Sequence, residues 1–147
     1  MTADLAAVDR RLRAILEPYR GRFAVVGDGP KGLALHLRGL EEQPHGFVAG
    51  VRPGKRYVSF YLMPVYGFPE LAQNMSPELR RRMQGKSCFN FTTIDEGLMA
   101  ELEALTARGL DEYQAAAKTG QGPFAAGRFE PAREAAGNTV PDRLTRL

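Results

Sequence analysis

Hydrophobic residues recur at helical spacing in the first part of the chain and form one apolar stripe. The stripe consists of Leu5, Val8, Leu12, Ile15 and Leu16. Thr2 is suited to cap such a helix, and Asp4 lies near its positive end. Because the residue before a proline is disfavoured in the helical region, Pro18 is expected to stop the helix. The pattern therefore predicts an amphipathic helix that ends just before Pro18.

The region that follows changes to the two-residue alternation of β-strands. We predict strands in residues 22–26, 33–38, 46–52, 56–63 and 86–91. One set of alternating positions is apolar and is expected to face the core: Leu33, Leu35, Leu37, Val58, Phe60, Leu62, Phe89 and Phe91. Short turns join the first four strands, which favours antiparallel pairing. In the turn after the third strand, Pro53 and Gly54 suit the two central positions of a type II turn.

The stretch "GDGPKG", residues 27–32, matches the glycine pattern of a dinucleotide-binding loop, G-x-G-x-x-G. Such a loop needs a helix after it, since the helix N-terminus supplies amide donors for the phosphates. Here alternating β residues follow, and Pro30 lacks one of the backbone donors. The glycines are therefore interpreted as hairpin turn residues that supply positive φ.

The second half of the chain is predicted to be mainly helical. Residues 64–75 form a proline- and aromatic-rich connection with one helical turn, and residues 76–85 form a compact helix. A long helical region begins near Asp95, and we expect Gly109 to kink or split it.

The order of helix, four strands, short helix, strand and long helix predicts a two-layer α+β sandwich. An antiparallel sheet of about five strands would carry the N- and C-terminal helices on one face. The chain has 147 residues, of which 44% are hydrophobic, which suits a single core. We expect one domain over residues 1–118. Residues 119–147 are rich in Gly, Pro, Ala and Arg and are predicted to form a tail, poorly ordered or wrapped on the surface.

Composition excludes several functional classes. The formal charge of +3 is mildly basic and lacks the strong bias of a dedicated nucleic-acid binder. The single cysteine, Cys88, and the lack of a signal-peptide pattern lead us to expect a cytoplasmic protein. No apolar run approaches the roughly 20 residues of a membrane span, so no membrane partner is expected. Two histidines and one cysteine, far apart in sequence, do not make a zinc motif, and the residues specify no cofactor.

Three segments resemble a known family: "KRYVSFYLMPVY", "SPELRRRMQGKSCFNF" and "RGLDEYQ". Over residues 33–114 the chain resembles the YdhG-like family, a bacterial group of domains of unknown function. The most telling pieces are "VSFY" with the following Pro64, and "GKSCFNF", which is similar to the family's Gly-Lys-Ser/Thr start of a strand. The resemblance implies a frataxin-like fold, and some family members are described as frataxin-like iron chaperones.

Frataxins present an acidic ridge on the first helix and first strand, and this chain departs from that pattern. Its first helix carries Asp4, Asp9 and Glu17 among the arginines Arg10, Arg11, Arg13 and Arg20. Iron prefers clustered carboxylates or histidines, and neighbouring arginines repel it. The resemblance therefore implies the fold, whereas the residues do not support the iron role.

The alternating polar positions of the strands are expected to share the sheet face opposite the helices. They are His36, Arg38, Tyr57, Ser59, Tyr61, Cys88 and Asn90. Such a face is suited to bind an anionic or aromatic small molecule, with Tyr66 and Phe68 closing over it from the following loop. Two alternatives stay open, because these residue types also occur on ordinary half-exposed sheets and at homodimer interfaces.

Cys88 is a candidate nucleophile if His36 lies across the sheet from it, although cysteine is also common as a half-buried strand residue. A basic group is suited to contact nucleic-acid phosphates or simply to face solvent: Arg80, Arg81, Arg82 and Lys86. An acidic group is suited to hold metal, to run acid–base chemistry or to complement a helix dipole: Asp95, Glu96, Glu101 and Glu103. We favour the dipole interpretation.

The leading hypothesis is a non-catalytic domain that binds a small ligand, a metal or a protein partner through this sheet face. An enzyme acting on a small anionic substrate, with Cys88, Tyr61 and Arg38 as working residues, is the alternative. Nucleic-acid binding through the segment from Arg80 to Lys86 is a third hypothesis.

Overall fold

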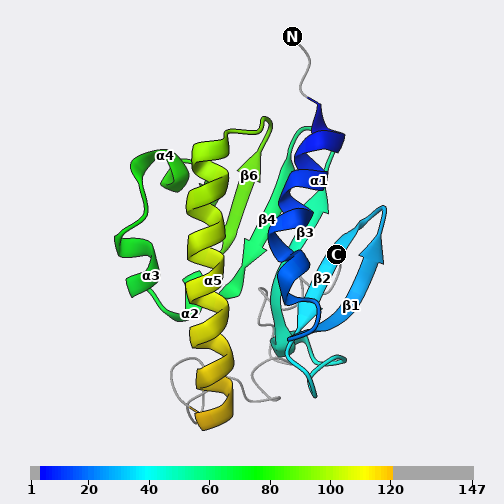
Figure 1. The fold of residues 1–147 in the computed structure, drawn as a ribbon, viewed down its shortest axis with the longest axis vertical. Coiled ribbons are helices and arrows are strands. Elements are labelled where there is room, and N and C mark those ends of the chain that lie inside the picture. The colour runs from blue at the N-terminus through cyan, green and yellow to red at the C-terminus, as the bar shows by residue number, and fades with distance from the viewer. Residues whose placement is uncertain (1–3, 121–147) are drawn as a thin grey trace.

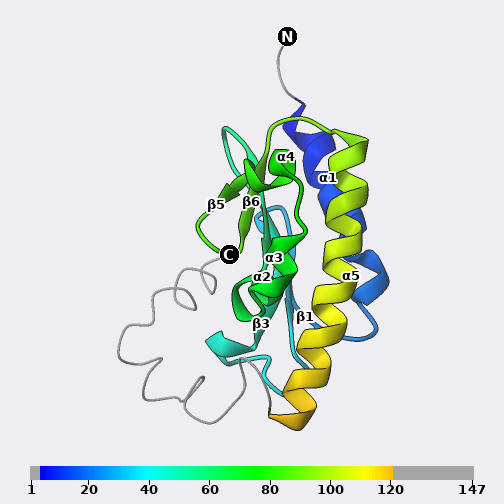
Figure 2. The same ribbon diagram turned by 90° about the vertical axis from the view of Figure 1, so that its left-hand side faces the viewer.

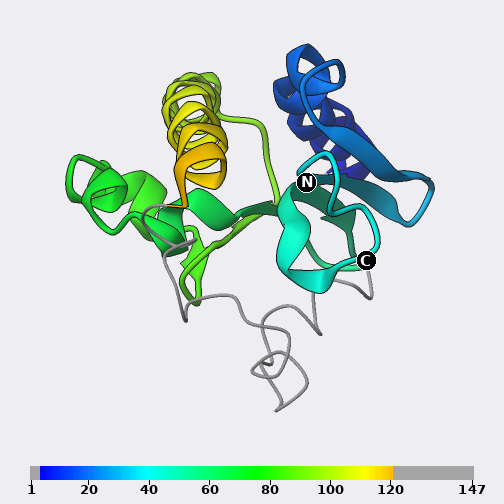
Figure 3. The ribbon, with the colours of Figure 1, turned by 90° about the horizontal axis from the view of Figure 1, so that it is seen from below.

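The computed structural model describes residues 4–120 as one α+β unit built on a six-stranded antiparallel sheet (Figure 1). The strands are β1 (Ala24–Gly29), β2 (Gly32–His36), β3 (Phe47–Pro53), β4 (Val58–Leu62), β5 (Met83–Gln84) and β6 (Cys88–Phe91). They lie in the order β1-β2-β3-β4-β6-β5. The helices α1 (Leu5–Leu16) and α5 (Glu96–Thr119) cover the same face of the sheet (Figures 2 and 3). The predicted fold class is therefore confirmed.

The start of α1 differs in detail from the prediction. The side chain of Asp4 accepts a hydrogen bond from the backbone N–H of Ala7 at 3.1 Å, so Asp4 is the N-cap. The prediction that Thr2 caps this helix is wrong, because α1 begins at Leu5. The stop at Pro18 is confirmed, since the chain passes into a short 3-10 helix, η1 (Glu17–Tyr19). The predicted apolar stripe packs into the core, where its buried members are Val8, Leu12, Ile15 and Leu16.

The "GDGPKG" stretch forms the tight hairpin between β1 and β2, and no helix follows it. Gly29 pairs with Gly32, so only Pro30 and Lys31 lie in the loop. Of the three glycines, only Gly32 has a positive φ, +148°. A Cβ atom on Gly32 would lie 2.6 Å from the carbonyl oxygen of Val51 on β3. The glycine is needed for positive φ and for close strand packing, and the hairpin interpretation is confirmed.

Helix α5 is continuous, so the predicted split at Gly109 is wrong. The Asp95 side chain caps it by accepting a hydrogen bond from the N–H of Leu98 at 3.2 Å. Gly109 is instead a packing residue, because α2 (Met63–Gly67) crosses directly over it. A Cβ on Gly109 would lie 2.9 Å from Cβ of Pro64. The absence of a side chain therefore lets α2 lie against α5.

The segment between β4 and β6 contains more elements than predicted. The connection forms α2 and α3 (Glu70–Gln73), and the following helix, α4 (Pro77–Arg80), is shorter than expected. Ser76 caps α4 as its sequence indicates, accepting from the N–H of Leu79 at 3.1 Å. Residues 83 and 84 leave the helix to form β5, because they pair with β6 at the sheet edge. The expected helix terminator Gly85 instead makes the turn between β5 and β6, with φ +81°.

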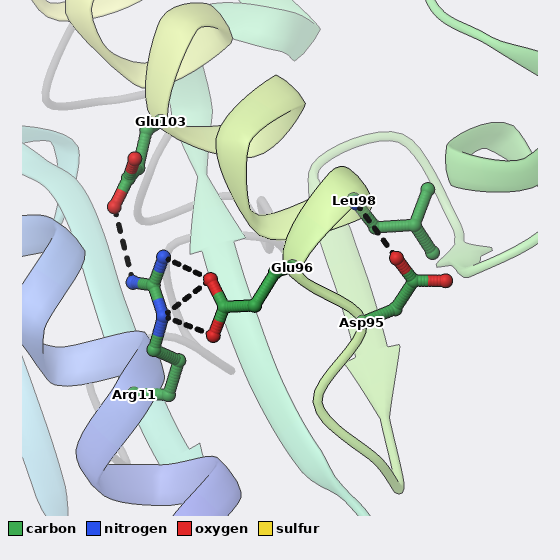
Figure 4. Close-up of polar contacts among 5 residues, drawn as sticks. All are labelled: Arg11, Asp95, Glu96, Leu98 and Glu103. Carbon is green, nitrogen blue, oxygen red and sulfur yellow. Dashed lines mark hydrogen bonds and ion pairs between the residues drawn. The ribbon is translucent and has the colours of Figure 1, made fainter.

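The two long helices are joined at their exposed sides by Arg11 of α1 (Figure 4). Its guanidinium contacts Glu96 at 2.9 Å and Glu103 at 3.0 Å, both on α5. These three side chains connect α1 to α5 above the sheet. Helix α5 ends at Thr119, and the rest of the predicted tail, residues 121–147, lies outside the described residues.

Candidate functional site

The strands distribute their side chains between two faces as their alternation predicts. The core face is filled by buried apolar residues: Leu33, Leu35, Leu37, Val58, Phe60, Leu62, Phe89 and Phe91. The face turned away from α1 and α5, here called the open face, carries the alternate positions. In the β4–β6 register, Ser59 lies opposite Asn90 and Tyr61 lies opposite Cys88. Four of the predicted site residues are therefore neighbours on this face.

A pocket of about 380 Å³ lies at the β3–β4 end of the open face. It is lined by Arg52, Gly54, Lys55, Arg56, Tyr57, Ser59 and Tyr61. Its volume falls at the small end of the range found for ligand sites, roughly 300–1,000 Å³. Three predicted site residues line the pocket, namely Tyr57, Ser59 and Tyr61. The other lining residues include three basic ones, which the alternation of polar positions along the strands did not select.

The turn between β3 and β4 presents these basic residues. The N–H of Gly54 donates to the carbonyl of Tyr57 at 2.9 Å and closes the turn. The predicted type II geometry is wrong, because such a turn requires positive φ at Gly54, and Gly54 does not have it. Glycine is needed here for space, since a Cβ on Gly54 would lie 2.9 Å from the same Tyr57 oxygen. The tight turn places Lys55 and Arg56 beside the pocket.

The pocket is electrostatically unlike the helix side of the molecule. Arg52, Lys55 and Arg56 are exposed, and none of them forms an ion pair with a carboxylate of residues 4–120. Within the same described part of the chain, no acidic residue lines the pocket. Three positive charges therefore share a small site without a neutralising partner, an arrangement that attracts anions.

The hydroxyl group of Tyr61 stays protonated at neutral pH. Burial raises the pKa of Tyr61 above its ordinary value of 10, and the neighbouring Cys88 raises it further, whereas Arg52 lowers it. Tyr61 can therefore donate a hydrogen bond to an anion. Ser59 is 7% exposed and contributes a second hydroxyl at the floor of the pocket.

His36 belongs to the open face but lies outside the pocket. Its ring packs edge-on against Phe47 with centroids 5.8 Å apart, and Phe47 packs against Tyr61 at 6.2 Å. Nδ1 of His36 donates to the carbonyl of Leu40 at 3.1 Å. Burial lowers the pKa of His36, and the bond to Leu40 opposes this only in part. The buried imidazole is therefore a structural group in a row of rings across the sheet.

Sequence reasoning did not select Phe47, although it connects His36 to the pocket. The register shifts between Leu35 and His36, so that Leu35 pairs with Ala49 while His36 pairs with Phe47. This β-bulge brings Phe47 to the open face, a displacement that simple alternation does not predict. The sequence did contain a signal for the basic residues of the pocket, because the turn segment "RPGKRY", residues 52–57, holds three cationic side chains.

Two further predicted site residues lie away from the pocket. Arg38 donates to the carbonyl of Gly21 at 2.9 Å, in the connection between α1 and β1. Tyr66, on α2, lies under the ammonium of Lys86, which is 5.7 Å from its ring centroid. The predicted closing role of Phe68 is wrong, because its ring packs edge-on against Tyr113 of α5, on the helix side.

Cys88 is half-buried on β6, and its thiol donates to Oδ1 of Asn90 at 3.4 Å. The candidate base His36 is on β2, which β3 and β4 separate from β6 in the sheet. With neighbouring strands about 4.8 Å apart, the two backbones lie roughly 14 Å from each other. The structure therefore does not bring the thiol and the imidazole together.

The acidic residues of α5 are used in structural contacts with other elements of the fold. Glu96 and Glu103 bind Arg11, while Glu101 accepts from the N–H and hydroxyl of Ser76 at 2.7 and 2.6 Å. Among residues 4–120, no group of three or more His, Cys, Asp or Glu side chains is placed to hold a metal ion.

The basic segment after Ser76 is also partly used in local contacts. Arg80 donates to the carbonyl of Ala72, and Arg81 forms an ion pair with Glu78 at 3.6 Å. The Lys86 ammonium contacts the Tyr66 ring, as described above. These groups are spread over separate contacts and do not converge on one site.

No protein-family profile, curated protein or solved structure matches the chain. In the described part of the chain, none of the helices combines the length and apolar character that crossing a membrane requires.

Proposed function

We propose that the protein binds a small anionic molecule, without catalysing a reaction on it, in the pocket formed by β4 and the β3–β4 turn. One observation carries the proposal: Arg52, Lys55 and Arg56 share this pocket without a carboxylate partner among the described residues. Like charges held close together repel each other, and a bound anion would relieve that repulsion. Phosphate and carboxylate groups are the anions that arginine binds with the best geometry.

Several arginines on the helix side of the molecule are paired with carboxylates. On the helix side, Arg11, Arg13, Arg20 and Arg22 each contact at least one carboxylate within 3.0 Å. The chain therefore has enough acidic residues to neutralise exposed arginines where its fold needs it. Other described cations also lack a carboxylate partner, among them Arg10, Lys31, Arg82 and Arg108, so it is the gathering of three such cations in one pocket that supports a role in binding.

The remaining lining residues complement an anion that carries an organic part. The Tyr61 hydroxyl is a neutral donor at physiological pH, because burial raises its pKa. Tyr57 is 38% exposed and presents an aromatic surface at the mouth of the pocket. Aromatic rings bind apolar or planar ligand groups, so the pocket is suited to a charged head with a small organic body.

The other hypotheses from the sequence receive less support. The enzyme hypothesis needs Arg38 close to Cys88 and Tyr61, whereas Arg38 contacts Gly21 in another part of the fold. A metal ion would meet the positive charges of the pocket. A homodimer or a protein partner at the open face stays a prediction, as does nucleic-acid binding through the segment after Ser76.

Membership of the YdhG-like family is part of this proposal. An antiparallel sheet with both terminal helices on one face supports the implied frataxin-like fold. The arginines of α1 disfavour an iron role, because Arg11, Arg13 and Arg20 bind the carboxylates around them. The single cysteine supports the prediction that the protein works in a reducing compartment such as the cytoplasm.

The test is isothermal titration calorimetry with inorganic phosphate at low ionic strength. We expect saturable binding, and we expect Arg56→Gln to weaken it about tenfold, the lower end of the effect of a charge-assisted hydrogen bond. Arg81→Gln is the control, since it removes another exposed arginine that lies outside the pocket. Lack of binding, or an equal loss of affinity in both variants, would contradict the proposal.

A further inference from the structure

A further cation, Lys31, lies at the tip of the β1–β2 hairpin, where Gly29 pairs with Gly32. Lys31 is exposed, and no carboxylate of residues 4–120 forms an ion pair with it. The one acidic residue of the hairpin strands, Asp28, is used elsewhere, because it contacts two arginines of the helix side at 3.6 and 2.9 Å. Lys31 therefore carries a positive charge that the described part of the chain does not neutralise.

The sheet register places Lys31 beside the pocket residue Arg52. Leu33 on β2 pairs with Val51 on β3. In an antiparallel pair, the next residues towards the hairpin, Gly32 and Lys31, therefore run alongside Arg52 and the residue after it. A Cβ atom on Gly32 would lie 3.6 Å from Cα of Arg52, in agreement with this close approach. Lysine has a flexible four-carbon stem, so the Lys31 ammonium can reach the surface beside Arg52.

The open face is continuous from the pocket to this hairpin. Arg52 lies opposite Ser59 in the β3–β4 register, and both line the pocket. Leu33 is buried in the core, so the preceding Gly32 occupies an open-face position. Because glycine has no side chain, Gly32 does not separate Arg52 from the hairpin. The basic surface therefore extends beyond the pocket by one strand.

The number of charges on this surface exceeds what one phosphate group can neutralise. Arg52, Lys55 and Arg56 line the pocket, and Lys31 brings the positive charges to four. A phosphate group on an organic molecule carries a charge of about −1.5 to −2 at neutral pH. One phosphate therefore leaves about two of the positive charges without a partner, whereas two phosphates balance all four.

We propose that this surface binds a bisphosphate, an organic molecule with two phosphate groups, in preference to a monophosphate. This inference rests on the proposed anion binding. The first phosphate occupies the pocket, and the second lies against Lys31, with Arg52 between the two groups. Neighbouring strands are about 4.8 Å apart, so the phosphates are separated by roughly 5–10 Å, which is one to two strand spacings. A short organic linker spans this distance.

The experiment compares propane-1,3-diol bisphosphate with propyl phosphate, which has the same three-carbon body and a single phosphate. Calorimetric titration of the full chain at low ionic strength gives the two dissociation constants. We expect the wild-type protein to bind the bisphosphate at least about tenfold more tightly. Lys31→Gln should weaken binding of the bisphosphate about tenfold, the lower end of the effect of a charge-assisted hydrogen bond, and should leave binding of propyl phosphate nearly unchanged.

Two variants control for general effects of charge. Lys118→Gln removes an exposed lysine near the end of α5, outside the pocket, and should keep the wild-type preference for the bisphosphate. Lys31→Arg keeps the positive charge at the hairpin and should also keep this preference. Since Lys31 is an exposed loop residue, its substitutions should leave the fold intact, which circular dichroism checks.

The outcomes separate this inference from the proposed function. If both esters bind, Arg56→Gln weakens both and Lys31→Gln weakens neither, then anion binding stands and the second phosphate site is overturned. Equal weakening of both esters by Lys31→Gln also overturns it, as does equal weakening of the bisphosphate by Lys118→Gln, because Lys31 would then act only through the net charge. If neither ester binds, both proposals are overturned.

Discussion

The contact between α2 and α5 gives a quantitative test of the packing. Gly109 is an interior residue of α5, where glycine normally destabilises a helix by about 1 kcal/mol relative to alanine. From propensity alone, Gly109→Ala should therefore stabilise the protein. The structure predicts the opposite sign, because a Cβ at this position would lie 2.9 Å from Cβ of Pro64.

The size of the effect follows from these two opposing terms. Carbon atoms pack at about 3.5–4.0 Å, so the new methyl must push α2 away from α5 by several tenths of an ångström. Both Gly109 and Pro64 are buried, and a proline ring cannot turn aside as a flexible side chain can. Overpacking of this kind costs about 1–3 kcal/mol. Subtracting the propensity gain leaves a destabilisation of about 1 kcal/mol.

Urea unfolding followed by circular dichroism measures this change. The best design is a double-mutant cycle with Pro64→Gly, which removes the Cβ and Cγ atoms that the new methyl would meet. In that background Gly109→Ala should stabilise the protein, because only the helix-propensity term remains. Gly97→Ala, near the start of the same helix, is a control without a neighbouring proline ring.

Two results would refute the reasoning. Stabilisation of the otherwise wild-type protein by Gly109→Ala would mean that α2 moves away at no cost. Equal destabilisation in both backgrounds would mean that Pro64 is not the group that excludes a side chain.

Two further predictions concern pH. Arg11 lowers the pKa of Glu96, so their contact contributes stability above the ordinary value of 4.5 and loses it as the pH falls below that value. Glu96→Gln should therefore reduce the free energy of unfolding at neutral pH, and this reduction should shrink as the pH falls below 4.5, whereas Glu42→Gln should have little effect at neutral pH. Burial lowers the pKa of His36 from 6.5, so its contribution to stability is present above pH 6.5 and is lost as the pH falls. His36→Gln should flatten the dependence of unfolding free energy on pH below pH 6.5, and an unchanged slope would show that His36 is not the group responsible.

The fold was predictable because hydrophobic and polar residues alternate clearly in β2, β4 and β6. Val58, Phe60 and Leu62 alternate without interruption, and the structure buries all three. The prediction failed where tertiary pairing overrides local preference. Met83 and Gln84 follow a well-capped helix start, yet they form a strand because β6 offers them partners.

The candidate site was only partly predictable for a related reason. Strand parity correctly places Ser59, Tyr61, Cys88 and Asn90 on one face, since the period of a strand is fixed. Side chains alternate between two faces only within a strand, so this alternation could not select the residues of the β3–β4 turn. It also fails across a bulge, which is why Phe47 was not expected on the open face.

The unequal pairing of arginines has a consequence for the kinetics of encounter. The full chain has 20 basic and 17 acidic residues, so setting aside Arg52, Lys55 and Arg56 leaves equal numbers of each sign. The three pocket cations would therefore add a local attraction for an approaching anion at one end of the open face. Charge interactions decay over about 8 Å at physiological ionic strength, so this guidance acts only close to the β3–β4 turn. Added salt should therefore slow capture of an anion more than it hastens its release.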